Sequence, residues 1–202
     1  MTQRYLIAAI VFAGIALGAT LFLWQPQQHT SLPPADVPKG GDFTLNSIDG
    51  PVSLSDYEGK IVALNFGYTL CPDICPTSLA LFSNALHQLT AEQQQKIQPI
   101  FISVDPERDT LEHLRDYSRY FHDRFIGLTG SPEAIQRVAN LYGASYRRVE
   151  SDSAAGYLVD HSSYLYLTDQ HGKLTNSIAY GTSPQQIRTV LLKLINSSPV
   201  KE

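Results

Sequence analysis

Cysteine is nearly absent from this sequence of 202 residues, which contains only Cys71 and Cys75. A structural zinc site normally takes four ligands from two paired motifs, and no His-x3-5-His motif follows this single pair. No cysteine lies near the N-terminus, where a lipid anchor would need one. The sequence therefore argues against structural zinc and lipidation, and it indicates that the two cysteines act as a pair.

Charge is also scarce. Charged side chains make up 17% of the residues, and 15 Lys and Arg stand against 19 Asp and Glu, for a formal net charge of −4. The basic residues form no run, whereas nucleic-acid-binding proteins usually carry a clustered basic patch. We therefore expect no nucleic-acid partner.

One long stretch has no charged side chain at all, from Tyr5 to Trp24. About 20 apolar residues are enough to cross the ~30 Å core of a bilayer. The aromatic ends suit the membrane interfaces, and Arg4 is expected to keep residues 1–4 in the cytoplasm. We expect a retained single-pass anchor over residues 5–24 in the inner (cytoplasmic) membrane, with the domain on the periplasmic side. The alternative is a cleaved signal peptide, whose apolar region is usually shorter.

The rest of the chain divides by composition. Residues 25–41 contain four prolines and three glutamines, as expected for an extended linker. Residues 42–196 carry the periodic apolar patterns of one folded domain, and residues 197–202 form a short tail.

The domain alternates between strand and helix patterns. A hairpin is predicted within residues 42–60, around the turn at Asp49-Gly50. Buried strands are predicted at 61–68, 97–104 and 125–128, helices at 110–121 and 184–195 and from Pro76 and Ser131, and a terminal strand pair at 162–167 and 173–178. Strands that alternate with helices predict a mainly parallel sheet with helices on both faces, to which the terminal pair adds antiparallel strands. A cysteine pair between the first long strand and a helix indicates a thioredoxin-like α/β fold, with a central mixed sheet flanked by helices.

The cysteine spacing leaves two chemistries open. Three residues separate Cys71 from Cys75, which permits a disulfide and also lets two sulfurs spread around a soft metal ion. A position at a helix N-terminus favours the thiolate, which serves either activity. Two thiolates leave Cu(I) with a third position to fill, and imidazole suits copper.

His161 is the strongest candidate for the third ligand. It precedes the strand predicted at 162–167, and a loop that enters a strand beside 61–68 can face the cysteine loop. The alternative is a histidine that hydrogen-bonds a loop carbonyl. Neighbouring Asp160 would orient the imidazole or would be a solvated acid. The other histidines are expected to be solvated: His29, His87, His113, His122 and His171.

Residues 103–110, Ser-Val-Asp-Pro-Glu-Arg-Asp-Thr, follow the second buried strand. The simpler interpretation is a loop in which Asp109 or Thr110 caps the next helix and Arg108 pairs with a neighbouring carboxylate. The loop is also expected at the same sheet edge as the cysteines, where open α/β sheets place their sites, so a role in partner docking is the alternative.

Three segments together resemble the Sco/SenC family of copper chaperones for cytochrome c oxidase. They are residues 67–76, with Cys-Pro-Asp-Ile-Cys-Pro, residues 104–110 and residues 159–166. The resemblance implies a membrane-anchored thioredoxin-like domain that holds copper through Cys71, Cys75 and His161, as Cu(I), with Cu(II) left open. It implies delivery to the dinuclear copper site of cytochrome c oxidase subunit II, with another periplasmic copper chaperone or a thiol reductant as a further partner.

Three other functions are open. In an exported thiol-disulfide oxidoreductase, Cys71 and Cys75 would be redox-active and His161 a bystander or a base. A peroxidase would need a reactive cysteine after a buried strand. A purely structural disulfide would add little stability, because the loop it closes is short.

Overall fold

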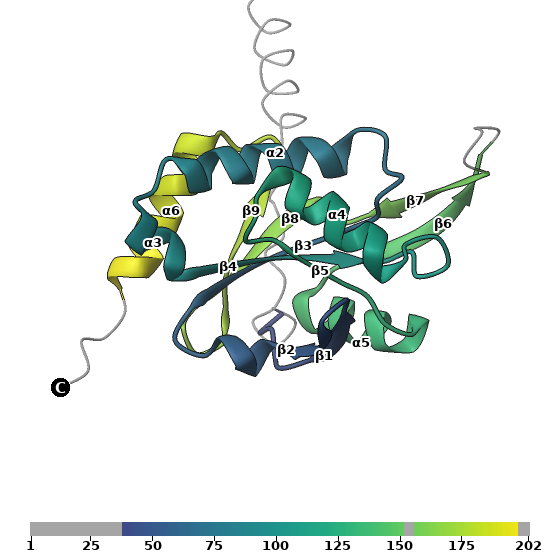
Figure 1. Ribbon diagram of the computed structural model, residues 1–202, viewed down its shortest axis with the longest axis horizontal. Coiled ribbons are helices and arrows are strands. Elements are labelled where there is room, and N and C mark those ends of the chain that lie inside the picture. The colour runs from purple at the N-terminus through teal and green to yellow at the C-terminus, as the bar shows by residue number, and fades with distance from the viewer. Residues whose placement is uncertain (1–37, 152–155, 198–202) are drawn as a thin grey trace, which may run out of the picture. The chain divides into compact units, whose positions relative to one another are not determined.

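The computed structural model describes residues 38–151 and 156–197 of the chain (Figure 1). Its elements are β1 (Thr44–Ser47), β2 (Gly50–Ser53), the 3-10 helix η2 (Leu54–Tyr57), β3 (Ile61–Gly67), α2 (Ile74–His87), α3 (Ala91–Gln95), β4 (Ile97–Ser103), α4 (Leu111–Phe121), β5 (Ile126–Leu128), α5 (Pro132–Tyr142), β6 (Tyr146–Glu150), β7 (Tyr157–His161), β8 (Tyr164–Thr168), β9 (Leu174–Ala179) and α6 (Pro184–Asn196).

A five-stranded sheet forms the centre, with the strand order β5-β4-β3-β8-β9. Strands β3, β4 and β5 run parallel, β8 is antiparallel to β3, and β9 is antiparallel to β8. Every residue of β3 and β4 is buried, as expected for strands covered on both faces. The predicted mixed sheet is confirmed, and β8 lies beside β3 as the sequence suggested.

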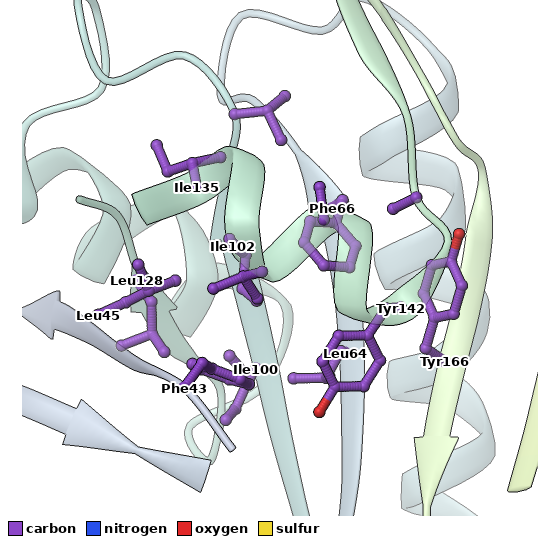
Figure 2. Packing of buried hydrophobic residues seen from close by; sticks show 14 of the residues in the cluster. Phe43, Leu45, Leu64, Phe66, Ile100, Ile102, Leu128, Ile135, Tyr142 and Tyr166 are labelled. Atoms are coloured by element: carbon purple, nitrogen blue, oxygen red, sulfur yellow. The ribbon is translucent and has the colours of Figure 1, made fainter. Parts of the chain in front are cut away.

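Alternate side chains of each strand enter two separate cores, because successive residues of a strand point to opposite faces. Leu64 and Phe66 pack with Tyr142 of α5 on one face (Figure 2). Ile61 and Ala63 pack on the other face, in a core to which α2, α4 and α6 contribute. Helices therefore cover both faces of the sheet, as predicted.

Local signals determine where the helices begin. The Thr110 hydroxyl accepts a hydrogen bond from the His113 N–H and caps α4, so Thr110 rather than Asp109 is the N-cap. Ser131 and Ser183 cap α5 and α6 in the same way. Helix α2 begins at Ile74, two residues before Pro76, so its first turn includes Cys75.

Three features were not predicted from the sequence: the 3-10 helix η2, the short helix α3 and the hairpin of β6 and β7. The hairpin projects from the body of the domain in Figure 1. The expectation of a loop around His161 was wrong, since His161 is the last residue of β7. Arg147, Arg148 and Asp160 are exposed, so this hairpin lacks the apolar pattern by which a buried strand is recognised.

One expectation about the histidines was also wrong. His122 is buried, with 9% of its surface exposed, and its ring lies 4.8 Å from that of His87, centroid to centroid. His87, His113 and His171 are exposed as expected, and His29 lies outside the described residues.

Within residues 38–151 and 156–197, no helix is both long enough and apolar enough to span a bilayer. The anchor predicted over residues 5–24 lies outside this part of the chain, as do most of the predicted linker and C-terminal tail.

Candidate metal centre

Three side chains from two distant parts of the chain meet at one end of the central sheet. Cys71 lies in the loop after β3, Cys75 in the first turn of α2, and His161 at the end of β7. Nε2 of His161 lies 3.1 Å from the Cys75 sulfur and 4.0 Å from the Cys71 sulfur, and the three atoms lie within 4.8 Å of one another. Two atoms that each lie ~2.3 Å from a shared ion can be at most ~4.6 Å apart, so small side-chain adjustments would let all three contact one ion.

The backbone around the cysteines brings their sulfurs together. The Cys71 N–H donates to the Tyr68 carbonyl at 3.2 Å, which closes a tight turn after β3. The backbone N–H of Cys75, in the first turn of α2, points at the Cys71 sulfur at 3.5 Å. Free N–H groups at a helix N-terminus favour negative charge, so this position stabilises a thiolate on Cys71.

The two thiols are electrostatically unequal. A hydrogen bond from the Cys75 thiol lowers the pKa of Cys71, and hydrogen bonds from backbone N–H groups lower it further. The hydrogen bond to Cys71, burial and the charge on Cys71 raise the pKa of Cys75. Cys71 is half-buried and Cys75 is buried, and both are free thiols. In the reduced pair, negative charge is therefore favoured on Cys71 and the proton on Cys75.

The imidazole of His161 is oriented by its own neighbour. Its Nδ1 lies 3.1 Å from the Ser162 carbonyl, which can only accept, so Nδ1 carries the proton. The unprotonated Nε2 then faces the sulfurs, which is the arrangement that a metal-binding histidine needs. The Tyr68 ring packs edge-on against the imidazole, with 6.0 Å between centroids. His161 therefore combines the two roles that were alternatives from the sequence. Its Nδ1 hydrogen-bonds a loop carbonyl, and its Nε2 is placed as a metal ligand would be.

Asp160 does not orient the imidazole. Its carboxylate is exposed and pairs with Arg147 at 2.9 Å, across the hairpin. The second interpretation of Asp160, a solvated acid, is therefore the one that the structure supports. The orienting group is a backbone carbonyl, which no sequence motif identifies.

Residues 103–110 contribute two buried acids beside the site, Asp105 and Asp109, with 4% and 2% of their surfaces exposed. Arg108 pairs with Asp105, as predicted from the sequence. Asp109 accepts hydrogen bonds from Thr69, and Tyr157 donates to Asp105, so the loop contacts both the cysteine segment and β7. Thr69 and Tyr157 were missed, although acids in the loop that follows a buried strand are a signal that such partners exist.

A family model described as SCO1/SenC matches residues 33–196 of the chain. A SCO2-like protein of Rickettsia felis is 40% identical over 154 residues, which cover 75% of each chain. The crystal structure of Arabidopsis thaliana ScoI with copper bound superimposes with a TM-score of 0.71 at 35% identity, over 79% of this chain and 99% of that one. The structure of BsSco, in which a disulfide switch was identified, superimposes with a TM-score of 0.63 at 25% identity, over 85% of this chain and 100% of that one. BsSco is described as a member of the Sco family of cytochrome c oxidase assembly proteins.

Proposed function

The chain belongs to the SCO1/SenC family, and from this premise we propose that it is a copper-binding metallochaperone of cytochrome c oxidase assembly. Cys71, Cys75 and His161 would hold the copper, and its recipient would be the dinuclear copper site of oxidase subunit II. The single observation that carries the proposal is the convergence of two sulfurs and one imidazole nitrogen.

The donor set fits copper. Thiolates are soft ligands that select Cu(I), and imidazole suits copper in either oxidation state. Nε2 of His161 needs no rearrangement of protons, because the Ser162 carbonyl already holds the proton on Nδ1. The half-exposed Cys71 leaves one side of the centre open to an incoming thiolate of the recipient. Copper would leave by stepwise ligand exchange, which requires both cysteines to be reduced.

We further propose that the anchor over residues 5–24 keeps the domain at the periplasmic face of the inner membrane. This location would bring the site close to an oxidase subunit in the same membrane. The apolar length of the segment and the position of Arg4 support the proposal.

An anaerobic titration of the reduced full chain in detergent, with Cu(I) against a competing chelator, tests the proposal. We expect one tightly bound Cu(I) per chain, loss of tight binding in Cys71→Ser and Cys75→Ser, and severe weakening in His161→Ala. His171→Ala, which changes an exposed histidine in the β8–β9 turn, is the matched control and should bind normally. Tight binding by the double cysteine variant would refute the proposal.

A second candidate, a thiol-disulfide oxidoreductase, is favoured by the unequal thiols. The Cys71 thiolate would attack a target disulfide and release one target thiolate, and Cys75, after losing its proton, would then attack the Cys71 sulfur and release the second. The target gains two electrons, and Cys71 and Cys75 form a disulfide. Reduction of a disulfide substrate that survives His161→Ala, but not loss of either cysteine, would support this activity.

A further inference from the structure

We propose that the β4–α4 loop (residues 104–110) is the positioning element of the centre, with Asp109 holding the cysteine segment and Asp105 with Arg108 holding the strand that carries His161. The inference rests on the proposed function, since it concerns the same three ligands. It assigns a role to buried polar residues that do not contact the ion themselves.

Asp109 anchors the cysteine side. One carboxylate oxygen accepts from the Thr69 backbone N–H at 3.1 Å and from the Ser103 hydroxyl at 2.6 Å. The other accepts from the Thr69 hydroxyl. A buried carboxylate needs such donors to offset its desolvation, so Thr69 is held firmly by the same bonds. Thr69 lies two residues before Cys71 and thereby sets the path of the backbone into the cysteine turn.

Asp105 and Arg108 anchor the histidine side through Tyr157. The Tyr157 hydroxyl donates to Asp105 at 2.7 Å, and Arg108 donates to the Tyr157 carbonyl at 2.9 Å. The Arg108 guanidinium also lies 3.5 Å from the centroid of the Tyr157 ring. Tyr157 is therefore bound at its ring, its hydroxyl and its backbone by one loop.

A second arginine completes the contact. The guanidinium of Arg148, from β6, lies 3.7 Å from the Tyr157 ring centroid, and Arg148 also pairs with Glu107 of the loop at 3.5 Å. Exposed pairs of this kind contribute little energy by themselves. They add a contact between the loop and β6, the other strand of the hairpin.

The position of Tyr157 in β7 connects this anchor to the metal centre. Tyr157 and His161 are the first and last residues of β7, and residues four apart in a strand project from the same face. Within the described residues, β6 and β7 pair only with each other, and no ladder joins them to the five-stranded sheet. Apart from the chain connections to α5 and β8, side-chain contacts therefore set the angle of the hairpin, and with it the distance from His161 to the sulfurs.

A double-mutant cycle on the full chain in detergent tests this role. Tyr157→Phe keeps the ring between the two arginines and removes only the hydrogen bond to Asp105. We expect it to weaken Cu(I) binding about tenfold to hundredfold, the range of one hydrogen bond to a charged group. In the His161→Ala background the same change should have no further effect, because the anchor acts through His161.

Asp109→Asn is expected to behave differently. It should weaken Cu(I) binding in the wild-type and His161→Ala backgrounds by the same factor, because it acts through the cysteines. Thr69→Val, which removes one donor and keeps the shape of the side chain, serves as the milder variant if Asp109→Asn does not fold. Asp160→Asn, which breaks an exposed ion pair on the same hairpin, is the control and should leave the affinity unchanged.

Amide hydrogen exchange of the metal-free chain gives a readout that needs no copper. Tyr157→Phe should speed exchange in residues 157–161, and Asp109→Asn or Thr69→Val should speed it in residues 69–75. Equal effects of Tyr157→Phe in both backgrounds, or unchanged exchange at both segments, would overturn the inference. Failure of the wild type to bind Cu(I) would instead refute the proposed function, and the exchange data would still test the positioning role.

Discussion

A β-carbon on Gly67 would lie 2.6 Å from the sulfur of Cys75 and 2.8 Å from the ring of Phe101. Gly67 ends β3, and its missing side chain provides the space in which the buried sulfur lies. Any larger residue at this position must displace either the sulfur or the aromatic ring, and real β-carbons essentially never approach other atoms so closely.

We therefore expect Gly67→Ala to lower both copper affinity and stability, with a stability cost of about 1–3 kcal/mol for overpacking. Cu(I) competition and urea unfolding measure the two effects. Gly127→Ala is the control, because its β-carbon would lie 2.7 Å from the Leu114 carbonyl oxygen, in a different part of the fold. It should lower stability and leave copper affinity intact, and an equal loss of affinity in both variants would contradict the expectation.

The low pKa of Cys71 depends first on the Cys75 thiol. Cys75→Ala removes that donor and should raise the pKa of Cys71, whereas Cys75→Ser keeps a donor and should raise it less. The pH dependence of iodoacetamide alkylation reports this pKa, because only the thiolate reacts. The buried Cys75 of a Cys71→Ser variant should react slowly at every pH tested. Identical alkylation profiles for wild type and Cys75→Ala would show that the hydrogen bond has no effect.

Copper binding should release one proton at neutral pH. Cys71 is already a thiolate, because its pKa is lowered, whereas the pKa of Cys75 is raised and its thiol must lose a proton to bind the metal. The Cu(I) affinity should therefore rise about tenfold per pH unit between pH 7.0 and 8.5. Competition titrations across this range measure the slope. A hundredfold rise per unit would mean that both thiols are protonated in the free chain, and a flat profile would mean that neither is.

His122 should make the domain less stable in mild acid. Burial lowers the pKa of His122, the nearby His87 lowers it further, and the Arg124 N–H donates to Nδ1, which protonation would prevent. The fold favours the neutral ring, so this contribution is complete above the unfolded pKa of about 6.5 and is lost as the pH falls from there through the folded pKa. Each unit of pKa depression corresponds to ~1.4 kcal/mol.

Urea unfolding at pH 8 and pH 5.5 measures this loss of stability. His122→Asn keeps an acceptor near the position of Nδ1 but does not titrate, so its stability should fall less over this range than that of the wild type. His171→Asn, at an exposed turn, is the control and should keep the wild-type pH dependence. Parallel losses in wild type and His122→Asn would exclude His122 as the source.

The parts of the fold that depend on neighbours in sequence could be predicted. The apolar run before Gly67 predicted a strand buried on both faces, and Ser131 and Ser183 marked the starts of two helices. Burial patterns and caps involve residues a few positions apart, so the sequence contains the whole signal. The β6–β7 hairpin was missed for the corresponding reason, since its exposed charged side chains produce no pattern of burial.

The candidate site could be predicted only in part. The proximity of Cys71 to Cys75 is determined by the sequence, because only three residues separate them where a loop enters a helix. The choice of Thr110 as the cap of α4, and of Asp109 as a partner of Thr69, could not be made without the structure. Asp109 and Thr110 are both good caps. Which of them caps α4 depends on Thr69, 40 residues before Asp109, because Thr69 donates to the Asp109 carboxylate.

The sequence by itself thus determined the buried strands, the capped helices and the cysteine pair. The tertiary structure decided that Nε2 of His161 lies 3.1 Å from a sulfur 86 residues away, and that one loop anchors both halves of the site. The physical reason is the range of the interactions. Propensity, capping and burial patterns act over one or two turns of chain, whereas the meeting of β7 with the cysteine turn depends on sheet order and on buried polar contacts between distant segments.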